Sequence, residues 1–436
     1  MTTSSPSRSA PGASSVRWWI CLLLFLATTI NYFDRQILSL LKPILDKELE
    51  WTNEQFGYVN AAFQGAYAVG LIVFGWFVDR FGTKVGYAVS IVAWSLAAAG
   101  HAFVGTVGGF LAARIALGLG EGGNFPSAIK GTAQWFPKRE RAFATSLFNS
   151  GTNVGAIVAP ATVPFIALTF GWHAAFIFAG MLGFVWLVAW LVFYEIPERH
   201  KAVNAAELAH IESDAEDPSD KGEKVPWLSL LGYRQAWAFI IAKFLTDPIW
   251  WFFLIWLPDY FNQTRGLNLK TLALPLIMIY VIVTILSISG SYLVGFLIQR
   301  GWSVTKARKT GMLVFALCVL PILLVTQANL WGAVALIGLA GAAHQAWSAN
   351  LFTTVSDMFP KRAVASVVGI GGMAGSIGGM LFPVFAGRLL DQFGEDATGG
   401  YAVLFGICSV AYLVALGINT LLAPRFEPVQ LPNSGA

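Results

Sequence analysis

Long apolar segments follow one another along almost the whole chain, and their length constrains the fold more than any other feature. A helix needs about 20 mostly apolar residues to cross the roughly 30 Å hydrocarbon core of a bilayer. Twelve segments are long enough, and the sequence therefore predicts an all-α membrane protein with twelve transmembrane helices. The segments lie at residues 18–41, 56–78, 85–104, 108–129, 142–168, 173–194, 237–261, 272–298, 310–327, 330–355, 364–388 and 401–423.

The composition agrees with residence in a lipid bilayer. Hydrophobic residues make up 56% of the 436 residues and charged residues only 12%, whereas a soluble protein has about 25% charged residues. In such a chain the net charge of +4 is weak evidence for nucleic-acid binding, because basic residues mostly set the orientation in the membrane. We therefore expect a bilayer around the protein and no nucleic-acid partner.

The residue types needed for metal or enzyme chemistry are not grouped in the sequence. Cys21, Cys318 and Cys408 each lie inside an apolar segment, without CxxC or metal-ligand spacing, so we expect neither a disulfide nor a metal site. No nucleophile stands beside a candidate base in the sequence, which argues against an enzyme. No cofactor is expected.

One long polar stretch divides the chain. Residues 195–235 contain many acidic residues, and this stretch reads as a soluble linker, with room for a short surface helix. The serine-rich start of the chain reads as a disordered tail. The predicted organisation is a tail at 1–17, a six-helix bundle at 18–194, the linker at 195–235, a second six-helix bundle at 236–424 and a tail at 425–436.

The basic residues predict the orientation of these helices, because loops on the cytoplasmic side are enriched in Lys and Arg. If the linker and both tails are cytoplasmic, most of the basic loop residues fall on that side. They include Lys138, Arg139, Arg141, Arg308, Lys309, Lys361 and Arg362. Few lie opposite, namely Lys42, Lys47, Arg265, Lys270 and Arg388. Both termini are therefore expected inside the cell.

An internal repeat supports two related halves. Trp135-Phe-Pro-Lys-Arg recurs as Met358-Phe-Pro-Lys-Arg, an offset of 223 residues. The same offset relates Gly118 to Gly341, Gly155 to Gly378 and Pro160 to Pro383. Parallel repeats with a binding site between them near the middle of the membrane are a common transporter design.

Two charges stand out in the fourth apolar segment. Arg114 and Glu121 lie on one helix face, about 10 Å apart along the axis. A charge in the membrane interior is costly and usually faces a watery cavity or a partner. They form either a structural ion pair or part of a substrate and proton site, and the spacing alone leaves both possibilities open.

The loop after the second segment carries an acid followed by two bases. It reads Gly75-Trp-Phe-Val-Asp79-Arg80-Phe-Gly82-Thr-Lys84. Asp79 could pair with a cytoplasmic arginine and hold the two halves in one state. The alternative is a solvated basic loop.

At Gly75–Lys84 the sequence resembles the major facilitator superfamily, and the resemblance covers nearly the whole chain. Within that superfamily it is most similar to the anion:cation symporters and especially to bacterial hexuronate (glucuronate and galacturonate) transporters. The motifs that carry this similarity are Asn31-Tyr-Phe-Asp34-Arg35, Arg114 to Glu121, Trp135-Phe-Pro and Trp250-Trp-Phe-Phe-Leu-Ile-Trp-Leu-Pro258. The resemblance implies a monomeric multi-pass protein of the bacterial inner membrane, with two pseudo-symmetric six-helix bundles that rock around a central site.

The resemblance also implies roles for the intramembrane charges. Arg35 would bind the substrate carboxylate, while Asp34 and Glu121 would take up and release protons, which are the coupling ion. A guanidinium group is always charged and presents a planar fork to a carboxylate, which agrees with this division. Arg114 would keep Glu121 ionised until substrate or a proton arrives.

The repeat places His344 at the counterpart of Glu121, so the segment around it is expected to line the cavity from the second half. An isolated histidine in the membrane is, however, equally consistent with a helix contact. The further candidate substrate contacts are Tyr32, Gln64, Tyr67, Asn124, Asn153, Gln345, Trp347, Ser348 and Asn350. Each of them could instead join helix to helix.

The seventh segment adds two open questions. Of the neighbours Trp250 and Trp251, one is expected to face the cavity, and Trp250 is favoured. Lys243 and Asp247 are one turn apart and can pair with each other, or Lys243 can help to bind an anion.

The sequence thus predicts import of a hexuronate by proton symport. The alternatives are another organic anion, such as an aldonate, an aldarate or a sugar phosphate, moved by symport or exchange, and a receptor that binds a sugar acid without transporting it. Gly372 stands where galactonate-type relatives place an asparagine, which argues against a simple aldonate.

Overall fold

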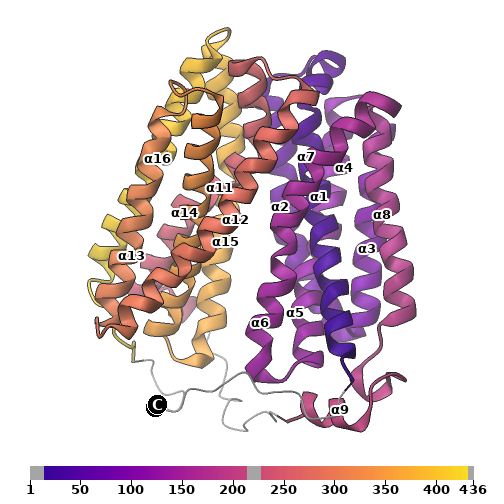
Figure 1. Cartoon of the computed structure of the whole chain (residues 1–436), viewed down its shortest axis with the longest axis vertical. Coiled ribbons are helices and arrows are strands. Elements are labelled where there is room, and N and C mark those ends of the chain that lie inside the picture. Colours follow the sequence, from indigo (N-terminus) through magenta and orange to yellow (C-terminus); the bar gives the residue numbers. More distant parts are fainter. Residues whose placement is uncertain (1–13, 214–226, 431–436) are drawn as a thin grey trace.

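The computed structural model describes residues 14–213 and 227–430, and within these ranges the chain consists of helices joined by short connections, with no strand (Figure 1). The first half contains α1 (Val16–Leu49), α2 (Asn53–Phe81), α3 (Thr83–Gly100), α4 (Val107–Glu121), α5 (Asn124–Trp135), α6 (Lys138–Asn149), α7 (Gly151–Phe170) and α8 (Trp172–Phe193). The second half contains α11 (Arg234–Arg265), α12 (Leu269–Gln299), α13 (Val304–Val319), α14 (Leu330–Met358), α15 (Lys361–Phe393) and α16 (Ala397–Leu422). Short helices α9 (Ala205–Ile211) and α10 (Trp227–Leu230) lie between the halves.

Every predicted membrane segment is a helix or a pair of consecutive helices. Ten helical segments in the described part are long and apolar enough to cross a membrane. The two remaining spans are α14, which carries His344 and Gln345 among its apolar residues, and the pair α4 and α5. The prediction of twelve transmembrane helices is confirmed.

Two spans are broken in the middle. The fourth span stops at Glu121 and restarts at Asn124, after two glycines, and the fifth span changes from α6 to α7 at Ser150. Gly122 and Gly123 pack against Gly70 and Ser90 so closely that a Cβ atom at either position would collide with them. The break therefore brings the end of α4, which carries Glu121, directly against α2 and α3.

The two halves meet mainly at one end of the molecule, the end away from α9 and α10, which we call the far end (Figure 1). The opposite end is called the linker end. At the far end Arg388 of α15 pairs with Glu54 of α2 at 2.6 Å. Asp391 accepts hydrogen bonds from the backbone amides of Asn53 and Glu54. A Cβ atom on Gly57 would stand only 2.6 Å from the carbonyl oxygen of Pro383, so the glycine permits this close contact.

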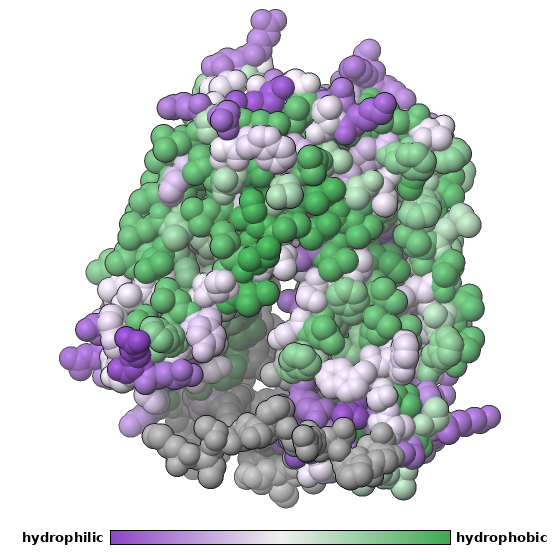
Figure 2. Space-filling view, in the orientation of Figure 1, coloured by the Kyte–Doolittle hydropathy of each residue, from purple (hydrophilic) through white to green (hydrophobic). Residues whose placement is uncertain are grey.

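The outer surface of the helices is apolar. Figure 2 shows a broad hydrophobic belt with hydrophilic residues above and below it. Large side chains such as Ile72, Phe165 and Val192 are exposed there. Exposed apolar surface of this extent is typical of a lipid-facing protein and would be unusual for a soluble monomer.

The linker differs from the expectation in one respect. The short surface helix is present as α9, but Glu207 on it is fully buried, although it was expected in a solvated linker. Its carboxylate accepts hydrogen bonds from Ser14 Oγ and from the backbone amides of Val16 and Arg17, and it pairs with the Arg17 guanidinium at 3.2 Å. These bonds satisfy amides at the start of α1 that a helix leaves open. Residues 1–13, 214–226 and 431–436, which include most of the predicted tails, lie outside the described residues.

Candidate functional site

A buried ion pair joins α1 to α4 in the middle of the first half. Arg35 Nε donates a hydrogen bond to Glu121 Oε2 at 2.7 Å, and the Glu121 side chain is fully buried. The contact uses one atom from each group. Arg35 Nη2 and Glu121 Oε1 are also buried, and neither has a hydrogen-bond partner among the described residues. The pair thus retains hydrogen-bonding capacity that a ligand could use.

Aromatic rings surround the Arg35 guanidinium. Its central carbon lies 4.5 Å from the ring centre of Tyr67, 4.7 Å from Tyr32 and 5.6 Å from Trp251. Rings at these distances attract a cation through their quadrupole. They also exclude water, so electrostatic interactions with Arg35 are stronger than they would be in solution.

Two further charges lie close by. Asp34 and Arg114 are almost fully buried, and both interact electrostatically with Glu121 and Arg35. Both Asp34 carboxylate oxygens, and Arg114 Nε and Nη2, have no hydrogen-bond partner in the described part of the chain. Buried polar groups without partners are rare in folded proteins, so this cluster is a strong functional candidate.

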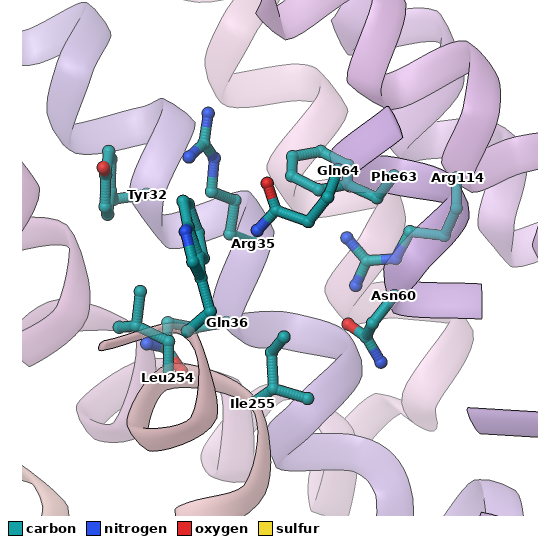
Figure 3. A pocket seen from close by; sticks show the side chains of 10 residues that line it. Tyr32, Arg35, Gln36, Asn60, Phe63, Gln64, Arg114, Leu254 and Ile255 are labelled. Carbon is teal, nitrogen blue, oxygen red and sulfur yellow. The ribbon is translucent and has the colours of Figure 1, made fainter. Parts of the chain in front are cut away.

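Arg35 makes the hydrogen bond to Glu121, whereas Arg114, which was expected to keep Glu121 ionised, acts on Glu121 electrostatically. Arg114 shares a helix with Glu121, whereas Arg35 reaches it from α1. Figure 3 shows Phe63 and Gln64 between the two arginines. The centre of the Phe63 ring lies 5.1 Å from the guanidinium carbon of Arg35 and 5.6 Å from that of Arg114. Sequence spacing identifies neighbours on one helix but not a closer partner on another.

The space beside this cluster is small. The chamber lined by Arg35, Arg114, Gln64 and Trp251 (Figure 3) has a free volume of about 20 Å³, which is room for about one water molecule. A much larger cavity of about 650 Å³ lies between the halves on the linker side, and we call it the vestibule. The vestibule has the size of a small-molecule binding site.

Two aromatic residues separate the chamber from the vestibule, because Tyr32 and Trp251 line both spaces. Trp250 also lines the vestibule, where its ring stacks on His344 with the ring planes 6° apart. The expectation that only Trp250 would face a cavity is therefore wrong. Neighbours on a helix differ by about 100° in direction, and here that angle directs each tryptophan to a different wall.

Several predicted contacts do line these spaces. Gln64 lines the chamber. Tyr67 lines neither space, but its ring lies over the Arg35 guanidinium. Lys243 and Asp247 form the expected ion pair, with 2.6 Å between Nζ and Oδ2. Gln345 donates a hydrogen bond to Asn153 across the two halves at 3.2 Å. The predicted residues that line the vestibule are Tyr32, Asn153, Trp250, His344, Gln345 and Ser348.

Three predicted substrate contacts line neither space and join helices instead. Asn124 accepts a hydrogen bond from Tyr87, and Asn350 donates one to the Arg308 carbonyl oxygen. Trp347 is fully buried against Tyr412. The polar atoms of these three side chains are hydrogen-bonded or buried within one half. A contact between helices was the alternative role left open for each of them.

The loop after α2 does not connect the halves in this structure. Asp79 pairs with Lys130 of α5 at 2.9 Å, within the first half, and Lys84 pairs with Glu195 at 3.0 Å. The Lys84 hydrogen bond lowers the pKa of the Glu195 carboxyl. Gly82 has a positive φ of 87°, which explains a glycine at this turn. Arg80 is exposed on the last turn of α2.

Sequence reasoning missed a buried charge network at the far end. Lys42 Nζ of α1 lies 2.9 Å from Asp259 Oδ1 of α11 and 2.8 Å from Asp46 Oδ2. It also donates to Asn53, and Tyr401 donates to the other Asp259 oxygen at 2.6 Å. Lys42 and Asp259 are both about 2% exposed. The available signal was an acid near the end of the seventh apolar segment and a base directly after the first, but the sequence does not show that these ends meet.

Known proteins give an independent view of the chain. The profile of the Major Facilitator Superfamily matches residues 24–383 and 309–436. The chain belongs to the Major Facilitator Superfamily. This is a family of transporters, so the expectation of a transporter rather than an enzyme is confirmed.

The relatives by sequence are named as sugar-acid transporters. The hexuronate transporter of Escherichia coli K12 is 33% identical over 95% of this chain and 96% of its own length. The galacturonate transporter of Dickeya chrysanthemi is 32% identical over 59% of this chain and 76% of its own length. A probable galactarate/D-glucarate transporter of Bacillus subtilis is 30% identical over 93% of this chain and 92% of its own length.

Solved structures show the same fold at low sequence identity. A bacterial homologue of the human lysosomal transporter Spinster, in an inward-facing and occupied conformation, superposes with a TM-score of 0.73 at 16% identity. It covers 95% of this chain and 98% of its own. A D-xylose-proton symporter has a TM-score of 0.72 at 16% identity, with 95% and 99% covered.

Proposed function

We propose that this protein imports a hexuronate, such as glucuronate or galacturonate, by symport with protons. The observation that carries the proposal is the Arg35–Glu121 pair, in which a buried base is held by a buried acid and both keep an unused polar atom. The hexuronate transporter that is 33% identical over almost the whole chain supports this substrate class.

The pair offers a direct way to couple proton and substrate. Glu121 and a substrate carboxylate compete for the same guanidinium group. A proton on Glu121 removes its charge and frees Arg35, which can then bind the substrate carboxylate through two parallel hydrogen bonds. Substrate and proton therefore favour each other's binding, as symport requires. Asp34, buried beside the pair without a hydrogen-bond partner in the described part, is the second proton-carrying group in this proposal.

Movement of the two halves completes the cycle. In this structure the far end is closed by charged contacts, while the vestibule lies on the linker side. With the linker in the cytoplasm, as the basic loops predict, this is the state that releases substrate into the cell. Uptake then requires the contacts of Lys42 and Arg388 to open on the outside while the vestibule closes.

The test is uptake of radiolabelled glucuronate into proteoliposomes, with the outside either more acidic than the inside or at equal pH. We expect accumulation only with the gradient, with galacturonate as the best competitor. Normal accumulation by a protein in which Arg35 and Glu121 are both replaced by glutamine would refute the assigned roles. Sodium-driven uptake in the absence of a pH gradient would refute proton coupling.

An aldarate is the second candidate substrate, because the vestibule holds another base, Lys243, that could take a second carboxylate. A relative named as a probable galactarate/D-glucarate transporter supports this candidate. Glucarate and galactonate therefore belong among the competitors in the uptake assay. Stronger competition by glucarate than by galacturonate would favour the dicarboxylate.

A further inference from the structure

The vestibule contains a charged pair that the role of Arg35 leaves unused. Lys243 and Asp247 of α11 are the charged residues lining it, besides His344, in the described part of the chain. The position of Asp247 is one turn, about 6 Å along the helix, before Trp251, which walls off the Arg35 chamber. The pair is therefore on the linker side of that wall, along the path from Arg35 toward the linker end.

Lys243 has hydrogen-bonding capacity to spare. An ammonium group has three donors, and the polar partner that the structure gives to Nζ is Asp247. On another side Nζ lies 4.3 Å from the ring centre of Phe352. The ring attracts the cation but accepts no strong hydrogen bond. A carboxylate that enters the vestibule would find donors on Lys243 without displacing other polar contacts.

Asp247 is held in place and is also incompletely bonded. Its Oδ2 accepts from Lys243, whereas Oδ1 is buried without a hydrogen-bond partner in the described part. Gly375 of α15 packs directly against this carboxylate, where a Cβ atom would collide with it. Asp247 therefore has one oxygen whose hydrogen-bonding capacity is unused. This oxygen is enclosed in the present conformation, and a turn of the carboxylate would present it to the hydroxyl group of a ligand in the vestibule.

The volumes separate this site from the one at Arg35. The chamber of about 20 Å³ beside Arg35 is too small for a sugar acid in this conformation, whereas the vestibule of about 650 Å³ has room for one. In the space-filling view the surface is hollowed between the halves toward the linker end (Figure 2). A substrate leaving Arg35 thus meets the Lys243–Asp247 pair before it reaches solvent.

We propose that Lys243 and Asp247 form a second binding site for a polyhydroxy carboxylate, occupied while the vestibule is open. Lys243 binds the carboxylate, and Asp247 accepts a hydrogen bond from a hydroxyl group of the same ligand. A base and an acid side by side fit a ligand that offers both an anion and hydroxyl donors. They fit a simple carboxylate less well, because its charge would face Asp247 without a compensating bond. This inference rests on the proposed function, since it assumes a sugar-acid substrate.

The experiment is equilibrium binding of radiolabelled glucuronate to the purified full-length protein. Four proteins are compared: the parent, Arg35→Gln, Lys243→Gln and the double variant. We expect Arg35→Gln to keep weaker binding, and Lys243→Gln added to it to lower the remaining affinity about tenfold, the usual effect of losing one charge-assisted hydrogen bond. Lys270→Gln, which removes an exposed lysine at the start of α12, is the matched control and should bind like the parent.

Two further variants separate binding from structure. Lys243→Arg keeps the charge and should retain binding, whereas equal loss in Lys243→Arg and Lys243→Gln would indicate a structural role only and overturn the site. Asp247→Asn removes the acid that opposes simple anions, so propionate should compete better against glucuronate than it does in the parent.

The outcomes distinguish the two proposals. A parent that does not bind glucuronate refutes the proposed function, and the second site with it. A parent that binds, together with an Arg35→Gln variant that binds nothing, leaves the proposed function standing and overturns the second site. The same conclusion follows if the double variant binds as well as Arg35→Gln alone.

Discussion

Replacing Lys42 by glutamine is expected to shift the protein away from the conformation described here. The Lys42 ammonium donates hydrogen bonds to Asp46 and Asn53, and it forms an ion pair with Asp259 at 2.9 Å. Without Lys42, Asp259 keeps Tyr401 as its hydrogen-bond donor but becomes a buried charge without a counter-ion. Removing one partner of a buried ion pair costs about 3–5 kcal/mol.

That cost applies only while the far end is closed, because opening it separates α1 from α11 and returns Asp259 to water. Taking about 3 kcal/mol, the ratio of the state closed at the far end to the opposite state should fall about 100-fold. Asp259→Asn should have a smaller effect, since Lys42 keeps Asp46 as its counter-ion. The double variant, Lys42→Gln with Asp259→Asn, has no unpaired charge at position 259. It should therefore recover part of the population that is closed at the far end.

The assay is maleimide labelling of a cysteine placed at Ala349, an exposed residue that lines the vestibule. The labelling rate of purified protein follows the population in which the vestibule is open, so it should fall in Lys42→Gln. Lys47→Gln, an exposed lysine on the last turn of the same helix, is the control. An unchanged rate in Lys42→Gln, or an equal fall in Lys47→Gln, would refute the reasoning.

Three other predictions follow from contacts described above. Glu121→Gln mimics the protonated acid, so we expect exchange of glucuronate between the two sides of proteoliposomes to persist. Accumulation driven by the pH gradient should be strongly reduced, because only Asp34 still carries a proton; accumulation equal to that of the parent would contradict this. Gly57→Leu should prevent close contact of α2 with Pro383 and reduce labelling at position 349, whereas the same change at exposed Gly417 of α16, which has open space around it, should not. Burial raises the pKa of Glu207, but the hydrogen bonds from Ser14 and from the amides of Arg17 and Val16 outweigh the effect of burial, so the pKa is lowered. The stability that the Glu207 carboxylate contributes is present above its unfolded pKa of about 4.3. This stability is lost as the pH falls through the folded pKa. Thermal unfolding in detergent should therefore show a lower midpoint for Glu207→Gln near neutral pH and a smaller difference at acid pH, and equal midpoints at neutral pH would show that the network does not anchor α1.

The sequence predicts much of the fold because the bilayer demands it. Each apolar segment must be helical to satisfy its own backbone, so length and hydropathy were enough to find all the spans. The break at Gly122 and Gly123 was harder to see. The two glycines permit contacts with α2 and α3, and the need for such contacts depends on neighbours that are distant in the sequence.

The site was predicted in composition but not in its pairing. Charge in an apolar segment identified Arg114 and Glu121, because a charge in the membrane interior is costly and usually faces a partner or a watery cavity. Arg35 was identified by the resemblance to the symporters. The choice of Arg35 over Arg114 as the partner of Glu121 depends on how α1 packs against α4, which spacing along one helix does not encode. Asn124 and Asn350 line neither space in this conformation for a related reason. An amide in a membrane helix can serve a ligand or a neighbouring helix equally well, and only the packing decides.

The wall formed by Tyr32 and Trp251 has a consequence for the timing of transport. Passage between the Arg35 chamber and the vestibule requires the Tyr32 and Trp251 side chains to move, and side-chain motion takes picoseconds to nanoseconds where the side chain is free to move. Separation of the Lys42 and Arg388 contacts moves whole helix bundles, which takes microseconds to milliseconds. The local barrier can therefore open and close many times within each half-cycle, so the turnover rate should depend on the resistance of the surrounding lipid to movement of the two halves and very little on the size of the aromatic side chains.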